Sequence, residues 1–245
     1  LGAVAHADDL KIFLEAGAPP GVVNVITGPG GTVGEALVSH PGVQKIGFTG
    51  DTATGKQIMS IASSHVKQLG LELGGKNAFV VMPDADVDSA VQGAIFAGFF
   101  NTGQVCAAAS RFFVHRSLYD EFCEKLVAEA KKLRYGDPMN PETVLGPVAY
   151  SEHRDKIESY IETAKKDGAR LLTGGERPDQ PETKDGAFVA PTIFADCTPD
   201  MKIMREEIFG PVLALTPFDT TEEAVGGVNA SPYGLCASLW TKDVA

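Results

Sequence analysis

The sequence predicts an α/β fold with a largely parallel sheet. Segments with the residue pattern of strands alternate with helical segments along the chain, an order typical of parallel sheets covered by helices. Of the 245 residues, 44% are hydrophobic and 22% are charged, which indicates a globular chain rather than a disordered one. This length fits one large domain or two modest ones.

The first 63 residues contain two predicted strands and three predicted helices. Apolar residues recur at steps of three and four from Val4 to Leu14, which predicts an amphipathic helix over residues 1–16. The β-rich run Val22–Thr27 predicts a short strand. The other elements of this part are a helix ending near Val38, a strand at Lys45–Thr49 and a helix that continues to about Ser63.

Two glycine-containing turns lie between these strands and helices. The first, over residues 28–34, departs from the dinucleotide pattern G-x-G-x-x-G because its sixth position is Val33, so we interpret it as turn chemistry. The second, Gly50–Lys56, combines a strand end, hydroxyl residues and a helix start. It would present backbone N–H groups and a positive dipole end to a pyrophosphate, although an ordinary N-capped helix has the same pattern.

A domain boundary is expected at Gly74-Gly75. The strand Val66–Leu73 precedes this pair, so we divide the chain into residues 1–73 and 74–245. A buried strand at Asn77–Met82 and an apolar helix at Asp86–Phe100 follow. The later strands and helices are expected at 112–115, 118–133, 151–167, 171–173, 192–194, 212–218, 221–229 and 236–240, with a surface loop at 174–186.

Charge and cysteine usage exclude several classes of partner. The formal net charge of −11 would repel nucleic acid and anionic membranes. The most apolar run, Val91–Phe100, is far shorter than the ~20 residues of a membrane-spanning helix. Four widely spaced cysteines without metal-ligand spacing favour a reduced, cytoplasmic location and no metal site. Because the chain begins at Leu1, inside a helical pattern, we interpret it as part of a longer protein.

Cys106 is the first candidate catalytic residue. It follows the apolar helix and Gly103, and its neighbours Ala107 and Ala108 are small, so the thiol could be exposed to a ligand. The alternative is a core cysteine, because unpaired cysteine is among the most buried residue types.

Glu72 is the second candidate. It lies between Leu71 and Leu73, so we expect it to be desolvated and its pKa to rise into the range of a general base. The alternative is a glutamate at a strand end that points to solvent.

Three ordered motifs resemble the signatures of the NAD(P)-dependent aldehyde dehydrogenases. They are the glutamate motif Leu71–Asn77, the cysteine motif Phe99–Arg111 and the segment Glu206–Val212, which is similar to the family's cofactor-ribose motif. The resemblance implies a partial Rossmann-like cofactor domain followed by an α/β catalytic domain. It also implies oxidation of an aldehyde with NAD or NADP in a homodimer or homotetramer.

The resemblance assigns roles residue by residue. It makes Cys106 the nucleophile that forms a thioester and Glu72 the base that activates the hydrolytic water. The implied cofactor-binding residues are Gly50, Asp51, Thr52, Gly55, Leu73, Glu207, Phe209 and Lys156. Asp51 stands where a serine is common in the family, and its carboxylate would disfavour a pyrophosphate unless it turns away to cap the helix.

Several alternatives remain open at this stage. The acyl acceptor could be CoA rather than water, or the chain could be catalytically silent. Glu207 and Phe209 could belong to a buried turn stabilised by Gly210-Pro211, and Lys156 could be an exposed helical charge. Among the other thiols and imidazoles, Cys123 is expected in the core, Cys197 and Cys236 as packing or surface thiols, and His115 at a strand end.

Overall fold

The computed structural model describes residues 11–184 and 186–243 and divides the chain into two compact units. The first unit is Leu1–Leu73 and the second is Gly74–Ala245. The boundary falls immediately before the glycine pair that follows the predicted strand. In the described part, no helix is long and apolar enough to span a membrane.

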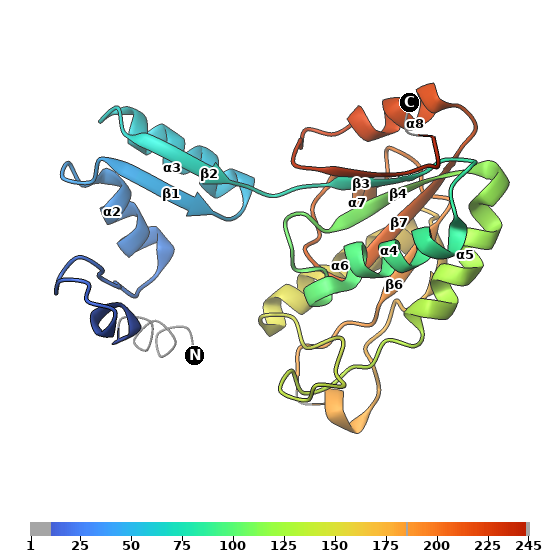
Figure 1. Cartoon of the computed structure of the whole chain (residues 1–245), viewed down its shortest axis with the longest axis horizontal. Helices are drawn as coiled ribbons and strands as arrows, with labels where there is room; N and C mark the ends of the chain where they lie inside the picture. The colour runs from blue at the N-terminus through green and yellow to red at the C-terminus, as the bar shows by residue number, and fades with distance from the viewer. Residues whose placement is uncertain (1–10, 185, 244–245) are drawn as a thin grey trace. The chain divides into compact units, whose positions relative to one another are not determined.

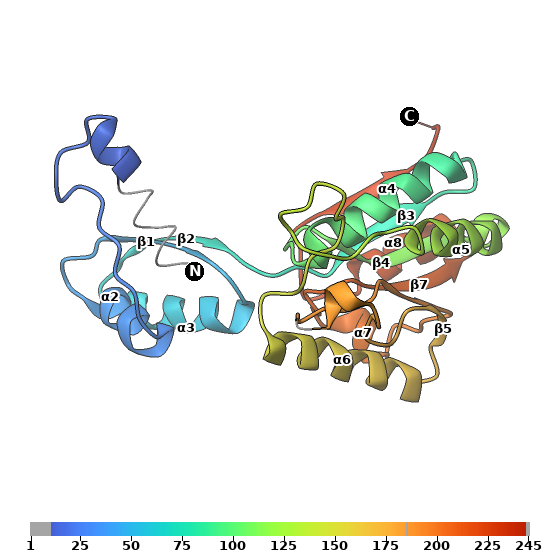
Figure 2. The same cartoon turned by 90° about the horizontal axis from the view of Figure 1, so that it is seen from below.

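The first unit contains a two-stranded parallel sheet. Strands β1 and β2 pair in parallel, and Figure 2 shows helices α2 and α3 on one face of them. The elements are η1 (Gly30–Gly34), α2 (Glu35–Ser39), β1 (Lys45–Thr49), α3 (Thr52–Ser63) and β2 (Gln68–Glu72). The strand at Lys45–Thr49 therefore has its predicted bounds.

Two predictions for the first unit need comment. Residues 22–27 form no strand, because their backbone has no neighbouring strand to take its hydrogen bonds, and an isolated β-rich run is not stable alone. Of the predicted helix over residues 1–16, residues 11–15 are helical, whereas residues 1–10 lie outside the described residues.

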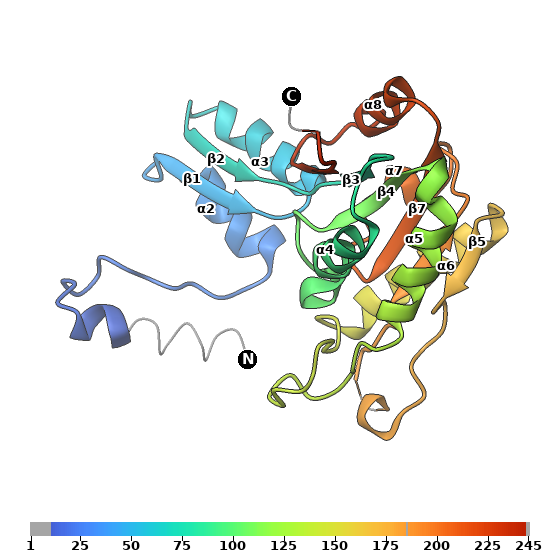
Figure 3. The same cartoon turned by 45° about the vertical axis from the view of Figure 1, so that its right-hand side comes forward.

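The second unit is built on a six-stranded sheet with the order β5-β6-β7-β4-β3-β8. Every neighbouring pair is parallel except β5 and β6, which are antiparallel at one edge (Figure 3). The strands are β3 (Asn77–Val81), β4 (Ala109–His115), β5 (Arg170–Thr173), β6 (Thr192–Ala195), β7 (Val212–Phe218) and β8 (Ala237–Trp240). This arrangement confirms the predicted largely parallel α/β fold.

Helices cover both faces of this sheet (Figures 1 and 2). Alternate sheet residues face α4 and α5, as Phe79 and Phe112 do, or face α6, α7 and α8, as Ala78 and Phe113 do. The helical elements are α4 (Val87–Phe99), η2 (Phe100–Gly103), α5 (Arg116–Ala130), α6 (Ser151–Lys166), η3 (Pro181–Thr183), α7 (Lys202–Arg205) and α8 (Thr221–Asn229). Burial on both faces explains why these strands read as continuous apolar runs.

Arg111 on β4 joins the sheet to α8. Its guanidinium is buried and donates hydrogen bonds to the carbonyl oxygens of Lys76, Gly227 and Val228 at 2.9, 2.9 and 3.0 Å. The last two carbonyls belong to the C-terminal turn of α8, where a cation also complements the helix dipole. This side chain therefore fixes α8 and the start of β3 against each other.

Candidate active site

The loop between α4 and β4 carries Cys106 and has an unusual backbone. Asn101, Thr102 and Gly103 have φ values of 50°, 57° and 70°, so three consecutive residues are left-handed. The Thr102 hydroxyl donates to the Gly146 carbonyl at 3.1 Å, and a side chain at Gly103 would collide with the Gly210 carbonyl. Packing thus holds a conformation that L-residues ordinarily avoid.

Cys106 lies in a turn, as predicted, and it is partly exposed, whereas its small neighbours had indicated an exposed thiol. Its carbonyl oxygen accepts a hydrogen bond from the Asn77 side-chain nitrogen at 2.7 Å, and the same nitrogen donates to the Ala108 carbonyl at 3.0 Å. A side chain at Gly75 would come within 2.7 Å of the Cys106 carbonyl. The glycine is therefore required for the close approach of these two backbones.

Sequence reasoning did not single out Asn77. The signal was available, because Asn77 is an amide at the start of a strand whose five residues are all buried. A buried amide needs hydrogen-bond partners, and a polar residue in such a strand is informative. Its partners are distant in the sequence, so they could not be identified from the pattern.

The other cysteines divide into two groups. Cys123 and Cys197 are buried, and burial raises the pKa of each thiol to about 12. Cys123 therefore has the core position that the sequence predicted. Cys236 is exposed, and its sulfur lies 3.6 Å from the Ala107 carbonyl oxygen.

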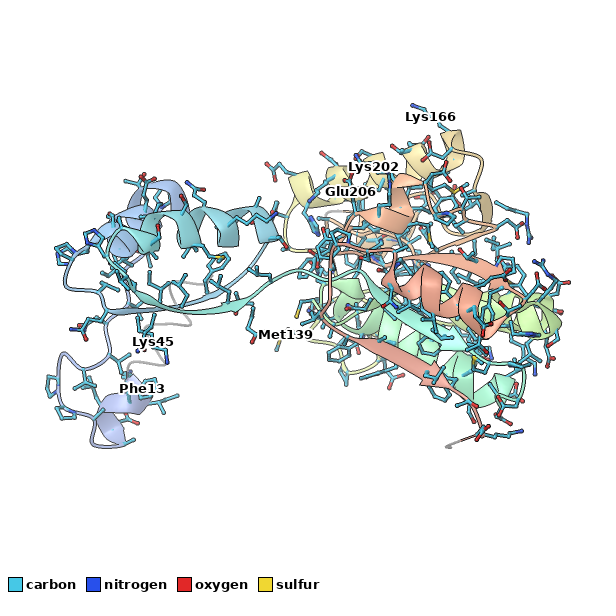
Figure 4. The ribbon with its side chains drawn as sticks, turned by 90° about the horizontal axis from the view of Figure 1, so that it is seen from above. Phe13, Lys45, Met139, Lys166, Lys202 and Glu206 are labelled. Atoms are coloured by element: carbon cyan, nitrogen blue, oxygen red, sulfur yellow. The ribbon has the colours of Figure 1, made fainter. Side chains whose placement is uncertain are left out.

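Glu207 lies against the glycine pair that opens the second unit. Its Oε1 accepts a hydrogen bond from the Gly75 backbone N–H at 3.1 Å, and a side chain at Gly74 would collide with its carboxylate. The neighbouring Glu206 differs, because Oε2 accepts a hydrogen bond from the Tyr160 hydroxyl at 2.7 Å and lies 3.8 Å from the Lys202 ammonium nitrogen (Figure 4). The two adjacent carboxylates thus have separate partners.

Phe209 is held in a strained backbone conformation. Its φ is 59° and its exposed fraction is 39%, both unusual for an aromatic residue between buried neighbours. Its carbonyl oxygen is 2.7 Å from Nε2 of the buried His153 on α6. Lys156, one turn further along α6, is exposed.

Asp51 in the first unit caps α3. Its Oδ1 accepts hydrogen bonds from the backbone N–H groups of Ala53 and Thr54 at 2.9 and 3.0 Å. A hydrogen bond from the Thr54 hydroxyl, together with these two backbone bonds, lowers the pKa of Asp51. The carboxylate therefore turns toward its own helix, as the sequence required for compatibility with a pyrophosphate, but it also occupies two N–H groups of the helix start.

The Thr52 hydroxyl lies in the same turn, but Asp51 does not bind it. Thr52 Oγ1 is buried and has no hydrogen-bond partner. The turn is tied to the end of β2, because the Gly50 N–H donates to the Glu72 carbonyl at 3.0 Å, and a side chain at Gly55 would press against Leu73. An orphaned hydroxyl beside a helix start suits an anionic group better than an apolar one.

The expected desolvation of Glu72 is wrong for this structure. Glu72 is exposed, because burial alternates along β2 and the residue lies on its exposed side. The flanking leucines point to the other face, as a strand dictates, and so do not cover the carboxylate. Glu72 and Cys106 belong to different units, and the expectation that they share one cavity stays a prediction.

Lys76 is a buried cation that the sequence analysis also missed. Its exposed fraction is 2%, and its Nζ has no hydrogen-bond partner. Burial, together with the nearby Arg111, lowers the pKa of Lys76 from its ordinary 10.5 to about 7, although the Glu207 carboxylate acts in the opposite direction.

The described residues contain no group of three or more His, Cys, Asp or Glu side chains suited to a metal ion.

We expect Lys76 to make the stability of the second unit rise with pH. Between about pH 7 and pH 10 the unfolded chain binds a proton at this site that the folded chain does not, so the free energy of unfolding gains up to ~1.4 kcal/mol per pH unit. Lys76→Met should remove this contribution. Urea unfolding followed by fluorescence of the single tryptophan, Trp240 on β8, measures the slope.

The matched control is Lys166→Met, which removes an exposed lysine of α6 (Figure 4). It should leave the pH slope of the unchanged protein intact. Equal slopes for the unchanged protein and Lys76→Met would contradict the assignment of a neutral buried amine.

Comparisons with known proteins cover almost the whole chain. The model of the aldehyde dehydrogenase family matches residues 3–245. Betaine aldehyde dehydrogenase of Bacillus subtilis (strain 168) is 47% identical over 234 residues, which make up 96% of this chain and 48% of that protein. The chain thus spans about half the length of the curated relative.

Two solved structures illustrate the structural similarity. Betaine aldehyde dehydrogenase from Staphylococcus aureus in complex with NAD+ is 42% identical, with a TM-score of 0.93 over 96% of this chain and 47% of that one. PnpE in complex with nicotinamide adenine dinucleotide is 43% identical, with a TM-score of 0.94 over 96% and 48% of the two chains. A point mutant of the S. aureus protein has also been solved in complex with NAD+ and with a BME-modified cysteine.

Proposed function

Because the chain belongs to the aldehyde dehydrogenase family, we propose that it oxidises an aldehyde to a carboxylic acid with NAD+ or NADP+ through a thioester on Cys106. The observation that carries the proposal is the position of this thiol. Cys106 is outside the hydrophobic core, in a turn. Its carbonyl oxygen accepts a hydrogen bond from Asn77 and packs closely against Gly75. Such an arrangement fixes a nucleophile without burying it.

The chemistry follows from what an aldehyde carbon requires. The Cys106 thiolate adds to the carbonyl carbon, and the Cys106 backbone N–H is a suitable donor to the resulting oxyanion. When bound, the nicotinamide supplies the acceptor for the hydride that leaves this carbon. Glu72 then takes a proton from the water that cleaves the thioester, which releases the acid and restores the thiol.

Residues of both units fit parts of the dinucleotide. In the second unit, the Glu207 carboxylate is an acceptor for ribose hydroxyls, and the exposed ring of Phe209 is a surface for the nicotinamide. In the first unit, the orphaned Thr52 hydroxyl is a donor to phosphate. Lys156 and the tightly packed Gly50, Gly55 and Leu73 complete the proposed cofactor-binding set.

The aldehyde itself is proposed only as a class. Both the B. subtilis relative and the S. aureus relative are named for betaine aldehyde, so that compound is the first to test. Ala107 and Ala108 after the nucleophile carry no charge that would clamp a charged substrate.

We expect Cys106→Ala to abolish aldehyde-dependent reduction of NAD+ or NADP+. The measurement follows reduced nicotinamide by absorbance in the intact protein, with betaine aldehyde and a panel of aliphatic and aromatic aldehydes. Cys236→Ser is the matched control, because it replaces an exposed thiol that takes no part in the proposed reaction. Absence of activity in the unchanged protein toward every aldehyde and both cofactors would overturn the proposal.

Glu72→Gln should separate the two halves of the reaction. The first turnover should still form one equivalent of reduced nicotinamide, whereas the steady-state rate should fall by about 10²–10⁴-fold because the hydrolytic water loses its base. Rapid-mixing kinetics measures both phases, with Glu35→Gln on the exposed surface of α2 as control. Equal losses in both phases would contradict this role, and a steady state rescued by CoA would identify CoA as the acyl acceptor.

Asp51→Ser should tighten binding of the dinucleotide. Serine also caps helices, so the substitution removes a negative charge near the proposed phosphate position without removing the cap. From typical charge effects at helix ends we expect the Kd to fall about two- to fivefold at low salt, and less at high salt. Calorimetric titration measures this, and Asp86→Ser at the cap of α4 controls for the loss of a capping carboxylate. An unchanged or higher Kd would contradict the proposed position of the phosphates near Asp51.

A further inference from the structure

Cys236 places a second thiol beside the proposed nucleophile. It lies immediately before β8, and its sulfur is 3.6 Å from the carbonyl oxygen of Ala107, the residue that follows Cys106. Cys236 is exposed and Cys106 is partly exposed. The reaction proposed above does not use Cys236, so its position next to the catalytic loop calls for a separate explanation.

One side chain connects the two cysteine residues. The Asn77 amide donates to the Cys106 carbonyl at 2.7 Å and accepts from the Cys236 backbone N–H at 3.1 Å. The pairing of β3 with β8, which sets Ala78 opposite Ala237, brings Cys236 level with Asn77. A disulfide requires two backbones that approach closely, and here the two cysteine backbones are bound by one amide while the Cys236 sulfur already contacts the residue after Cys106.

The surroundings of Cys236 also act on its thiol. Partial burial raises the pKa of the Cys236 thiol, and the nearby Cys106 sulfur raises it further. Cys123 and Cys197 are in a different situation, because both are buried. The exposed and partly exposed thiols of the described chain therefore belong to the two cysteines that Asn77 connects.

We infer that Cys236 is a resolving thiol, which traps peroxide-oxidised Cys106 as an intramolecular disulfide. The inference rests on the proposed function in one respect, namely that Cys106 is a reactive nucleophile. The modifying reagent belongs to the class of hydroperoxides, with hydrogen peroxide as the simplest member. The thiol pair is then a modification site in addition to its catalytic use.

The two steps balance as follows. The Cys106 thiolate attacks one peroxide oxygen, the O–O bond breaks, and the hydroxide that leaves takes up a proton to become water. Cys106 is thereby oxidised to a sulfenic acid, while the peroxide is reduced. Cys236 then attacks the Cys106 sulfur, an S–S bond forms, the S–O bond breaks, and the hydroxide leaves as water with the Cys236 proton.

The consequence is protection of the nucleophile. A sulfenic acid left alone is oxidised further to sulfinic and sulfonic acids, which thiol reductants do not reverse. A disulfide is reduced by small thiols through exchange. A chain with Cys236 should therefore lose activity reversibly under peroxide, whereas a chain without it should lose activity permanently.

The test compares the unchanged intact protein with Cys236→Ser after treatment with a small excess of hydrogen peroxide. Peptide mass mapping of the unchanged protein should give one cross-linked peptide pair containing Cys106 and Cys236, which disappears with dithiothreitol as both thiols return. In Cys236→Ser, the same dose should yield sulfinic or sulfonic acid at Cys106, with a loss of aldehyde oxidation that dithiothreitol does not restore. Cys123 and Cys197 serve as internal controls and should stay reduced in both proteins.

Three outcomes overturn the inference. They are a sulfinic Cys106 beside a free Cys236 in the unchanged protein, a cross-link formed only between two copies, and equal recovery of both proteins with dithiothreitol. Because mass mapping requires no turnover, a cross-link in a protein that oxidises no aldehyde would refute the proposed function and leave the thiol pair standing.

Discussion

The candidate site depends on the hydrogen bonds of one buried amide, that of Asn77. Its side chain donates to the Cys106 and Ala108 carbonyls and accepts from the Cys236 N–H, so it joins three segments of the second unit. Leaving this buried amide without hydrogen-bond partners would cost about 1–3 kcal/mol of folding free energy. Folding therefore favours the arrangement in which the segments carrying Cys106 and Cys236 both contact Asn77. The position of the cysteine turn is therefore set by β3, a central strand, more than by the sequence of the turn itself.

Two buried cations lie next to this amide and constrain the same region. Arg111 uses its guanidinium to satisfy three backbone carbonyls, whereas the Nζ of Lys76 has no hydrogen-bond partner. A lone buried ammonium is costly, and the protein reduces that cost because the pKa of Lys76 falls to about 7. The Glu207 carboxylate opposes this fall. A group that changes the charge of Glu207 would thus also change the protonation of Lys76.

The sequence predicted local features well and long-range contacts poorly. The strand Lys45–Thr49 and the helix Thr221–Asn229 follow from residues within a few positions of each other. The contacts of Asn77 with Cys106 and with Cys236 span 29 and 159 residues, so no local pattern contains them. Glu72 shows a different failure. Its leucine neighbours suggested burial, but successive residues of a strand face opposite ways.

Backbone strain links the cysteine loop to the segment that presents Phe209. Asn101, Thr102 and Phe209 are left-handed, and such residues cost of order 1–3 kcal/mol each and persist only where their surroundings hold them. Here the Thr102 hydroxyl binds the Gly146 carbonyl and His153 binds the Phe209 carbonyl. Gly103 packs directly on the Gly210 carbonyl, so the two strained segments touch where a side chain would separate them. The loop that carries the thiol and the segment that carries the aromatic ring are therefore packed against each other, and a backbone change at Gly103 would disturb Gly210.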